Sequence, residues 1–390
     1  MGGSELIGKE EKEAIGEVID RGAVLFRYGF DEQRKNIFKV KEFEEEFAAY
    51  AGVKYALGVA SGTAALRVAL AALGIGPGDE VITQSFTFVA TVEAIMEAGA
   101  TPVIAEVDKS LNLDPEDLEA KITEKTKAVI PVHMLGVPAP MDEIISIAKK
   151  HNLKILEDSA QACGSSYKGK KTGTLGDIGI YSFDYVKTIT TGEGGMVVTN
   201  DENLYLEASY FYDHGHEHRS DVPRGEDTQK RRGFNYRMGE IQGALGIVQL
   251  SRLDYVIGEQ RKNKARIKEA LSGIKELSFR DLPDEAGDGG DTLIFFLPNK
   301  GMADNFEKEL TRQGIGTKIL PSALDWHYFA NWEHIIKALK GRIEYQIGMW
   351  PHSDSFLRRA IAISISVKMT DEQIESIISA LQKAAQTVLL

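Results

Sequence analysis

The sequence predicts an α/β protein, in which a large domain with a mostly parallel sheet, covered on both faces, precedes a smaller α+β domain. Apolar segments of strand length alternate with amphipathic helical segments over residues 55–199, a pattern typical of parallel sheets. This alternation ends in the last third of the chain, where two strands and two helices follow a polar stretch. A length of 390 residues also favours two domains.

We place the large domain at residues 1–255 and the small domain at residues 256–390. Residues 1–36 are expected to form an N-terminal arm, in which a helix at 8–21 leads into an irregular aromatic stretch. Apolar residues from Leu245 to Leu253 predict one helix that continues past Arg261 and links the domains.

The individual elements follow from hydrophobic periodicity and from turn residues. After a helix that begins near Lys41, strands are expected at residues 55–60, 80–83, 101–107, 126–133, 153–156, 178–183 and 196–199. Helices are expected to begin at 61 and near 91, and to span 115–122 and 141–151. The small domain should contain strands at 293–297 and 361–367 and a helix at 302–312. Thr370 and Gln373 have the spacing of a capping box for the last helix.

Composition narrows the functional class. The net charge of −12 argues against a nucleic-acid or anionic-membrane partner. A single cysteine excludes an intramolecular disulfide framework and suits a reducing compartment. The N-terminal residues are too charged for a signal peptide, and no apolar run approaches 18 residues. We therefore expect a cytoplasmic protein.

Several polar or aromatic residues lie at or just after the ends of the expected strands. Ligands on parallel sheets bind beyond the carboxyl ends of the strands. The residues in these positions are Thr63, Phe88, His133, Asp158 and Ser182. We expect them to converge on one site.

Lys187 lies between the strand at 178–183 and a glycine-rich turn at 192–195. A lysine held in this way reaches into a cleft, and when desolvated it becomes an amine nucleophile. Asp158 at a strand end can hold a positive charge on a ring nitrogen, and Phe88 can lie flat against a ring. Taken alone, a lysine in this position would more often be a solvated surface residue than a catalytic one.

The segment Ser61-Gly62-Thr63-Ala64 opens a helix. Small and hydroxylated residues at a helix N-terminus suit a phosphate, although an ordinary serine cap has the same sequence signature. Together with Ser182, this segment could bind a phosphate. The other three features are the amine of Lys187, the acid of Asp158 and the aromatic ring of Phe88. Those four features together match the requirements of pyridoxal phosphate.

Other chemistries have weaker support. His214, His216 and His218 alternate as on one face of a strand, but no standard set of metal ligands accompanies them. They could also form a polar loop that faces substrate, and we predict no metal. The glycines at 173, 176 and 179 lack dinucleotide-binding spacing, and no G-x-S-x-G elbow is present.

Five segments resemble the sugar aminotransferases of the DegT/DnrJ/EryC1/StrS family, which have the fold-type-I pyridoxal-phosphate transferase fold. They are SGTAAL at 61–66, TFVAT at 87–91, EDSAQACG at 157–164, SFDYVKTITTGEGG at 182–195 and FNYRM at 234–238. The family also contains dehydratases that carry histidine in place of the Schiff-base lysine. Because this chain retains Lys187, the resemblance favours transamination.

The resemblance also implies roles for the residues. Lys187 would be the Schiff-base lysine and proton shuttle, Asp158 would pair with the pyridine nitrogen, and Gln161 would bind the 3-hydroxyl group. Phe88 would stack on the ring. The phosphate would be held by Ser61, Gly62, Thr63, Ala64 and Ser182, with Asn235 of the partner subunit. The resemblance thus implies a homodimer with shared active sites.

L-Glutamate is the expected amino donor and a keto or aldehyde sugar the expected acceptor. Arg237 is our first choice for the donor carboxylate and Arg219 the second, with exposed surface charges as the alternative.

The segments at 213–218, 263–264, 325–328 and 331–332 resemble the branch that aminates C8 of 3-deoxy-manno-octulosonate (Kdo), a lipopolysaccharide sugar. His214, His216 and His327 would meet the carboxylate of that sugar. The alternatives are a nucleotide-linked keto-deoxysugar as acceptor, a sugar dehydratase or a non-catalytic sugar-binding regulator.

Overall fold

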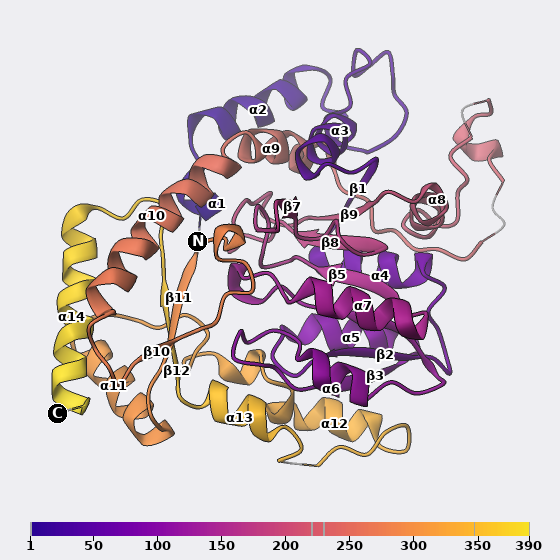
Figure 1. Cartoon of the computed structure of the whole chain (residues 1–390). Helices are drawn as coiled ribbons and strands as arrows, with labels where there is room; N and C mark the ends of the chain where they lie inside the picture. Colours follow the sequence, from indigo (N-terminus) through magenta and orange to yellow (C-terminus); the bar gives the residue numbers. More distant parts are fainter. Residues whose placement is uncertain (1, 220, 229–230, 347, 390) are drawn as a thin grey trace.

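The computed structural model describes residues 2–219, 221–228, 231–346 and 348–389. Its centre is a seven-stranded sheet with the order β1-β9-β8-β5-β4-β2-β3 (Figure 1). The strands are β1 (Tyr55–Val59), β2 (Glu80–Gln84), β3 (Thr101–Ala105), β4 (Thr126–Ile130), β5 (Lys154–Asp158), β8 (Ile178–Ser182) and β9 (Gly195–Thr199). β9 runs antiparallel to both of its neighbours, and the pairs from β8 to β3 are parallel. The expected mostly parallel sheet is therefore confirmed.

Helices cover both faces of this sheet because successive strand residues point in opposite directions. Val81, Ala128 and Leu156 pack towards α4 and α5, whereas Ile82 and Val129 pack towards α7. The helices of this region are α3 (Lys39–Ala51), α4 (Gly62–Ala72), α5 (Val89–Glu97), α6 (Pro115–Ala120), α7 (Met141–His151) and α8 (Glu202–Phe211).

A second sheet has the order β10-β11-β12 and a hydrophobic core of its own. Its strands are β10 (Ser278–Phe279), β11 (Thr292–Phe296) and β12 (Ala360–Ser364), and its helices are α10 (Leu253–Leu271), α11 (Lys300–Arg312) and α14 (Asp371–Leu389). The capping box before α14 is confirmed. The Thr370 N–H donates to Gln373 Oε1 at 3.0 Å, and the Gln373 N–H donates to Thr370 Oγ1 at 3.3 Å.

The expectation of one long helix through residues 245–261 is wrong. α9 (Glu240–Leu250) ends at Leu250, and α10 begins after a turn at Ser251 and Arg252. Arg252 donates to the Leu6 carbonyl at 2.9 Å and to Glu11 at 2.8 Å. These contacts with the N-terminal segment hold the turn, and no local sequence pattern signals them.

The region after α11 returns to the large sheet. α12 (Glu333–Leu339) and α13 (Pro351–Leu357) flank Tyr345 and Trp350, which bond to β3. The Tyr345 hydroxyl donates to the Pro102 carbonyl at 2.7 Å, and the Trp350 Nε1–H donates to the Ile104 carbonyl at 3.1 Å. They cover the edge of the sheet at β3. The division at residues 255 and 256 falls within α10 and stays a prediction.

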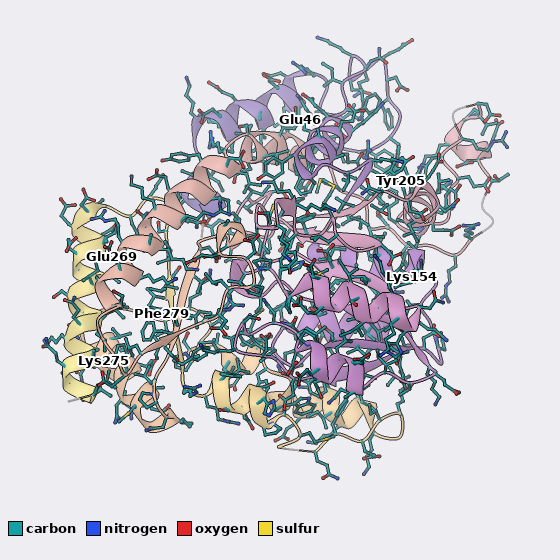
Figure 2. The ribbon with its side chains drawn as sticks, in the orientation of Figure 1. Glu46, Lys154, Tyr205, Glu269, Lys275 and Phe279 are labelled. Atoms are coloured by element: carbon teal, nitrogen blue, oxygen red, sulfur yellow. The ribbon has the colours of Figure 1, made fainter. Side chains whose placement is uncertain are left out.

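The remaining elements are α1 (Gly2–Glu5), α2 (Lys9–Asp20), β6 (Ser166–Tyr167) and β7 (Lys170–Lys171), with 3₁₀ turns at Met134–Gly136, Arg224–Glu226, Glu285–Gly287, Leu324–Trp326 and Phe329–Asn331. Exposed charged side chains such as Glu46, Lys154, Glu269 and Lys275 lie on the outside of the molecule (Figure 2). Among the helices of the described residues, none has the length and apolarity needed to span a membrane.

Candidate active site

A cavity with two adjoining lobes opens beyond the carboxyl ends of β5 and β8. The inner lobe has a volume of about 100 Å³ and the outer lobe about 260 Å³. Four residues line both lobes, namely Phe88, Gln161, Asp184 and Lys187. The inner lobe also contains Ser61, Gly62, Thr63, Asp158 and Ser182, so most of the residues expected at the site are brought together.

Backbone hydrogen bonds hold the loop that carries Lys187. Beyond the end of β8, the Phe183 N–H donates to the Gly194 carbonyl at 2.8 Å, and the Thr191 N–H donates to the Phe183 carbonyl at 2.9 Å. The Lys187 N–H donates to the Asp184 carbonyl at 3.0 Å. Burial lowers the pKa of Lys187, although Asp184 and Asp158 act in the opposite direction. The lowered pKa favours the neutral amine that a nucleophile needs.

Asp158 is the last residue of β5 and is 3% exposed. One carboxylate oxygen accepts from the Ala160 N–H at 3.1 Å, and the other accepts from Thr91 Oγ1 at 2.8 Å. Burial raises the pKa of this carboxyl, opposed by these hydrogen bonds and by Lys187. A positively charged group bound in the inner lobe would therefore stabilise the ionised form of this buried carboxyl.

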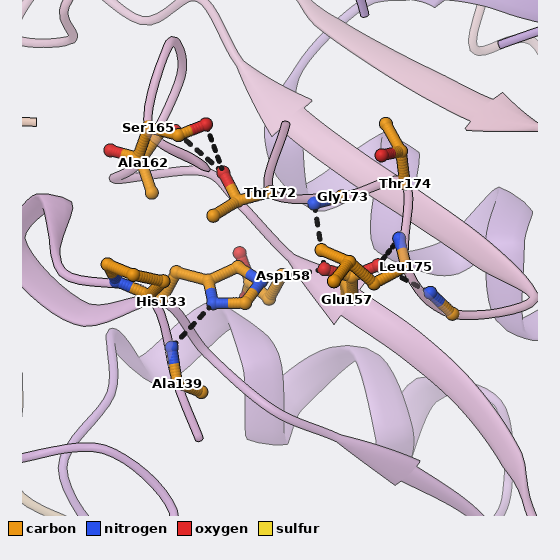
Figure 3. A network of polar contacts seen from close by, with 12 residues as sticks. His133, Ala139, Glu157, Asp158, Ala162, Ser165, Thr172, Gly173, Thr174 and Leu175 are labelled. Carbon is orange, nitrogen blue, oxygen red and sulfur yellow. Dashed lines mark hydrogen bonds and ion pairs between the residues drawn. The ribbon is translucent and has the colours of Figure 1, made fainter. Parts of the chain in front are cut away.

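A buried polar network lies behind Asp158 (Figure 3). The Glu157 carboxylate accepts from His133 Nε2 at 2.9 Å, from the Gly173 N–H at 2.8 Å, and from the N–H groups of Leu175 and Gly176. His133 Nδ1 accepts from the Ala139 N–H at 3.0 Å, which assigns the ring proton to Nε2. His133 thus acts behind the site and does not line it.

The phosphate cup expected at the start of α4 has the backbone geometry for close approach. Ser61 caps the helix, and its Oγ accepts from the Ala64 N–H at 3.0 Å, so Ala64 contributes to the cap. A Cβ on Gly62 would lie 2.7 Å from Ser182 Cβ. Glycine is thus required where the helix N-terminus meets the end of β8, and the helix dipole favours an anion there.

Phe88 is 41% exposed and forms one wall of both lobes. Its ring centroid lies 5.5 Å from that of His327, which lines the outer lobe. Burial lowers the pKa of His327, and the Lys187 charge adds to this effect. Neutral His327 therefore supplies no positive charge for the carboxylate that it was expected to meet. The charged side chains of the outer lobe are those of Asp184, Lys187, Asp291 and Lys318.

Asn235, His214, His216, Arg219 and Arg237 lie outside both lobes of this chain, within its described residues. The Arg219 and Arg237 side chains pair with Asp221 and Asp213 respectively. The expectation that His214, His216 and His218 share a strand face is wrong, because His214 and His218 both have a φ of 54° within a loop. The turn at Gly215 breaks the alternation that the spacing suggested.

Three further residues at the site had no role predicted from the sequence. Thr91, in the first turn of α5, binds Asp158, and its place three residues after Phe88 was the signal that could have identified it. Lys318 and Asp291 line the outer lobe as an ion pair at 2.5 Å. Both lie in the C-terminal third of the chain, and no sequence pattern connects them to Lys187.

These residues fit pyridoxal phosphate. Asp158 is the buried acid that the ring nitrogen requires, and Lys187 is the amine with a lowered pKa. The close contact between Gly62 and Ser182 forms a cradle for the phosphate, and Phe88 presents a ring face to the cavity. The inner lobe therefore has a partner for each part of the cofactor.

Comparisons with known proteins agree with this site. The model of the DegT/DnrJ/EryC1/StrS aminotransferase family matches residues 31–382. The chain is 47% identical over 221 residues to a GDP-perosamine synthase of Caulobacter vibrioides, a match that covers 55% of this chain and 57% of that protein. It is 33% identical to a dTDP-3-amino-3,4,6-trideoxy-alpha-D-glucose transaminase of Streptomyces venezuelae, over 98% of this chain and 94% of that protein.

A similar solved structure is also that of an aminotransferase. The aminotransferase from Psychrobacter cryohalolentis superposes with a TM-score of 0.88 at 30% identity, covering 98% of both chains. The family model and these full-length similarities together span almost the entire chain. The protein therefore belongs to the DegT/DnrJ/EryC1/StrS aminotransferase family and is a pyridoxal-phosphate-dependent sugar aminotransferase.

Proposed function

We propose that this aminotransferase takes its amino group from L-glutamate and delivers it to the aldehyde carbon of 8-oxo-3-deoxy-manno-octulosonate. The product would be 8-amino-3,8-dideoxy-manno-octulosonate, for lipopolysaccharide. The observation that carries amino transfer is the placement of Lys187 and Asp158 on the wall of one cavity. Bound pyridoxal phosphate supplies the electron sink for both half-reactions.

Each residue of the cavity would then have a separate role in catalysis or in cofactor binding. Asp158 keeps a proton on the ring nitrogen, and Thr91 orients the Asp158 carboxylate. Lys187 Nζ takes the proton from the α-carbon of the donor, which its lowered pKa favours. Ser61, Gly62, Thr63 and Ser182 hold the phosphate, while Gln161 binds the 3-hydroxyl group.

The Kdo acceptor is supported by the segment at 213–218 and by His327 in the outer lobe. Other parts of that resemblance have structural roles in this chain. Lys264 forms an ion pair with Asp288, and the Asn263 amide donates to the Ser366 carbonyl. Of the residues in that set, His327 is the one that lines the cavity of this chain.

A nucleotide-linked keto-deoxysugar is the second candidate acceptor. It is favoured by the names of two relatives, a GDP-perosamine synthase and a dTDP-amino-sugar transaminase. A nucleotide would extend from the outer lobe, where the Lys318–Asp291 pair provides polar contacts.

We also propose a homodimer with shared sites. Asn235, His214, His216 and Arg237 all belong to the stretch 213–237, whose described residues lie outside the cavity of their own chain. In a homodimer this stretch would reach the cavity of the other subunit. Arg237, or else Arg219, would then meet the donor carboxylate.

The acceptor is tested by separating the half-reactions. Incubation with L-glutamate alone should bleach the visible absorption of the bound cofactor, and an effective acceptor should restore it. We expect oxidised Kdo to restore the absorption with a higher kcat/KM than GDP-linked or dTDP-linked keto-deoxysugars. Faster restoration by either nucleotide sugar would transfer the assignment to the second candidate.

A further inference from the structure

Residues 2–11, the N-terminal segment, lie directly against the backbone of the lysine loop, which is the connection between β8 and β9 at residues 183–194. α1 is next to α10 in the structure, although about 250 residues separate the two in the sequence (Figure 1). The Gly3 N–H donates to the Lys187 carbonyl at 3.3 Å. Gly2 and Gly3 are both buried. The catalytic lysine is thus hydrogen-bonded through its own main chain to a segment outside the cavity.

This contact requires glycine at both positions. A Cβ on Gly2 would lie 2.3 Å from Val256 Cγ1 and 3.0 Å from the Thr188 carbonyl oxygen. A Cβ on Gly3 would lie 2.7 Å from the Thr190 nitrogen. Because neither position has a positive φ, the requirement is for space alone. The segment fits only because its backbone packs against the backbone of residues 188–190.

Side chains fix the segment from the other side. Gln249 Oε1 accepts from the Thr190 N–H at 3.3 Å, and Gln249 Nε2 donates to Glu11 Oε1 at 2.8 Å. Arg252 also donates to Glu11, and it donates to the Leu6 carbonyl. Glu11 is 1% exposed, so these charge-assisted hydrogen bonds are shielded from water.

The same segment also reaches the small sheet. The Glu5 carboxylate accepts from the Ser366 hydroxyl and from the Lys368 N–H, just after β12. Residues 2–11 therefore connect three parts of the molecule, namely the lysine loop, the α9–α10 turn and the end of β12.

We propose that residues 2–11 form a positioning element for the catalytic lysine, with Gly3 and Gln249 as its positioning residues. The hydrogen bonds of Asp184 and Gly194 hold one side of the lysine loop. The N-terminal segment holds the other side, at the Lys187 carbonyl and the Thr190 N–H. Both constraints fix where Lys187 Nζ lies. The inference rests on the role proposed for Lys187.

Gly3→Ala tests the proposal, with Gly16→Ala as the matched control. Gly16 lies in α2, where a Cβ added to the residue would meet no heavy atom within 4 Å, so alanine should be accommodated there. In Gly3→Ala we expect the cofactor to stay attached to Lys187. The rate of the glutamate half-reaction should fall by roughly tenfold to a hundredfold, because sub-ångström to 1 Å misplacement has such effects.

Two further readouts separate positioning from a general loss of structure. The pH at which the absorption of the bound cofactor changes should shift in Gly3→Ala and not in Gly16→Ala, because Lys187 moves relative to Asp158. Gln249→Met keeps the side-chain volume and removes the hydrogen bonds of Gln249 with Thr190 and with Glu11, so it should reproduce the effect. It is the variant to rely on if Gly3→Ala does not fold.

Wild-type half-reaction rates and pH profiles in both Gly3→Ala and Gln249→Met would overturn the proposal. Borohydride treatment of the wild-type protein separates this failure from that of the proposed function. If the cofactor is trapped on Lys187 and the variants behave as wild type, only the positioning role is lost. If it is not trapped on Lys187, the role of the lysine itself is wrong.

Discussion

Burial and nearby carboxylates have opposite effects on the pKa of Lys187. Burial favours the neutral amine, whereas Asp184 and Asp158 favour the ammonium form, and burial has the larger effect on the pKa. The cofactor-free protein therefore carries a destabilising lysine at neutral pH. This has a consequence for folding stability that can be measured without any substrate.

Replacement of Lys187 by methionine should stabilise the cofactor-free protein in a pH-dependent way. The pKa of Lys187 in the folded state is lower than the value of about 10.4 in an unfolded chain, so between the two values the unfolded chain binds more protons. Wild-type stability therefore rises with pH in that window. The Tm of Lys187→Met minus that of the wild type should be largest at neutral pH and shrink towards about pH 10. A constant difference would contradict the lowered pKa.

Asp158 and Thr91 should contribute unequally to catalysis. Asp158→Asn removes the negative charge that we propose holds the proton on the ring nitrogen, and we expect kcat to fall by about a hundredfold or more. Thr91→Val keeps the volume and removes one hydrogen bond to a carboxylate, so the loss should be about tenfold. Steady-state kinetics of both variants would measure this, and equal effects would contradict the arrangement.

Among the elements, the start of α4 has the tightest geometry. Gly62→Ala would place a methyl group 2.7 Å from Ser182 Cβ and 3.0 Å from its Oγ, inside the cradle proposed for the phosphate. We expect the Kd for pyridoxal phosphate to rise at least about tenfold, equivalent to about 1.4 kcal/mol. Gly76→Ala, where no heavy atom lies within 4 Å, is the control. Cofactor titration followed by absorption would show whether both variants bind alike, which would contradict the cradle.

Local patterns in the sequence predicted those elements that depend on local physics. The βα alternation, the Ser61 cap and the Thr370–Gln373 capping box follow from residues a few positions apart. The break between α9 and α10 depends on Arg252 bonding to Leu6 and Glu11, which lie at the other end of the large domain's sequence. The loop at 213–218 depends on Asp213, which is buried and pairs with Arg224 and Arg237. No local sequence pattern predicts contacts between residues so far apart in the chain.

The same distinction applies to the candidate site. Asp158, Phe88 and Ser182 could be predicted because strand ends converge on one edge of a parallel sheet. Lys318 and Asp291 could not, since they approach the cavity from the region around the small sheet. Their placement depends on how two cores pack together, and the sequence contains no periodic signal for that.

At the scale of the whole molecule, the described residues of the stretch 213–237 pack against the arm at residues 22–36. Arg237 lies over the Phe26 ring at 5.3 Å, and Tyr28 stacks on His218 at 4.8 Å. Phe26 and Phe30 are nevertheless exposed in the single chain. Exposed aromatic residues next to a polar stretch that contains Asn235 suit the proposed contact between subunits.

A complementation experiment tests the shared site. A Lys187→Ala subunit retains Asn235, and an Asn235→Ala subunit retains Lys187. If a site uses Lys187 of one subunit and Asn235 of the other, mixing the two impaired variants restores one intact site per heterodimer. We expect activity to appear on subunit exchange, well above that of either variant alone. No recovery, with heterodimers demonstrated by mass spectrometry, would contradict the sharing of sites.

The central claim is that Lys187 is the residue to which pyridoxal phosphate attaches. The measurement that tests it most directly is borohydride reduction of the purified protein in the presence of the cofactor, followed by peptide mapping with mass spectrometry. The structure leads us to expect the mass of the reduced cofactor on the peptide that contains Lys187, and its loss in Lys187→Met. A modified lysine elsewhere in the chain, or an unmodified wild-type protein, would contradict the account.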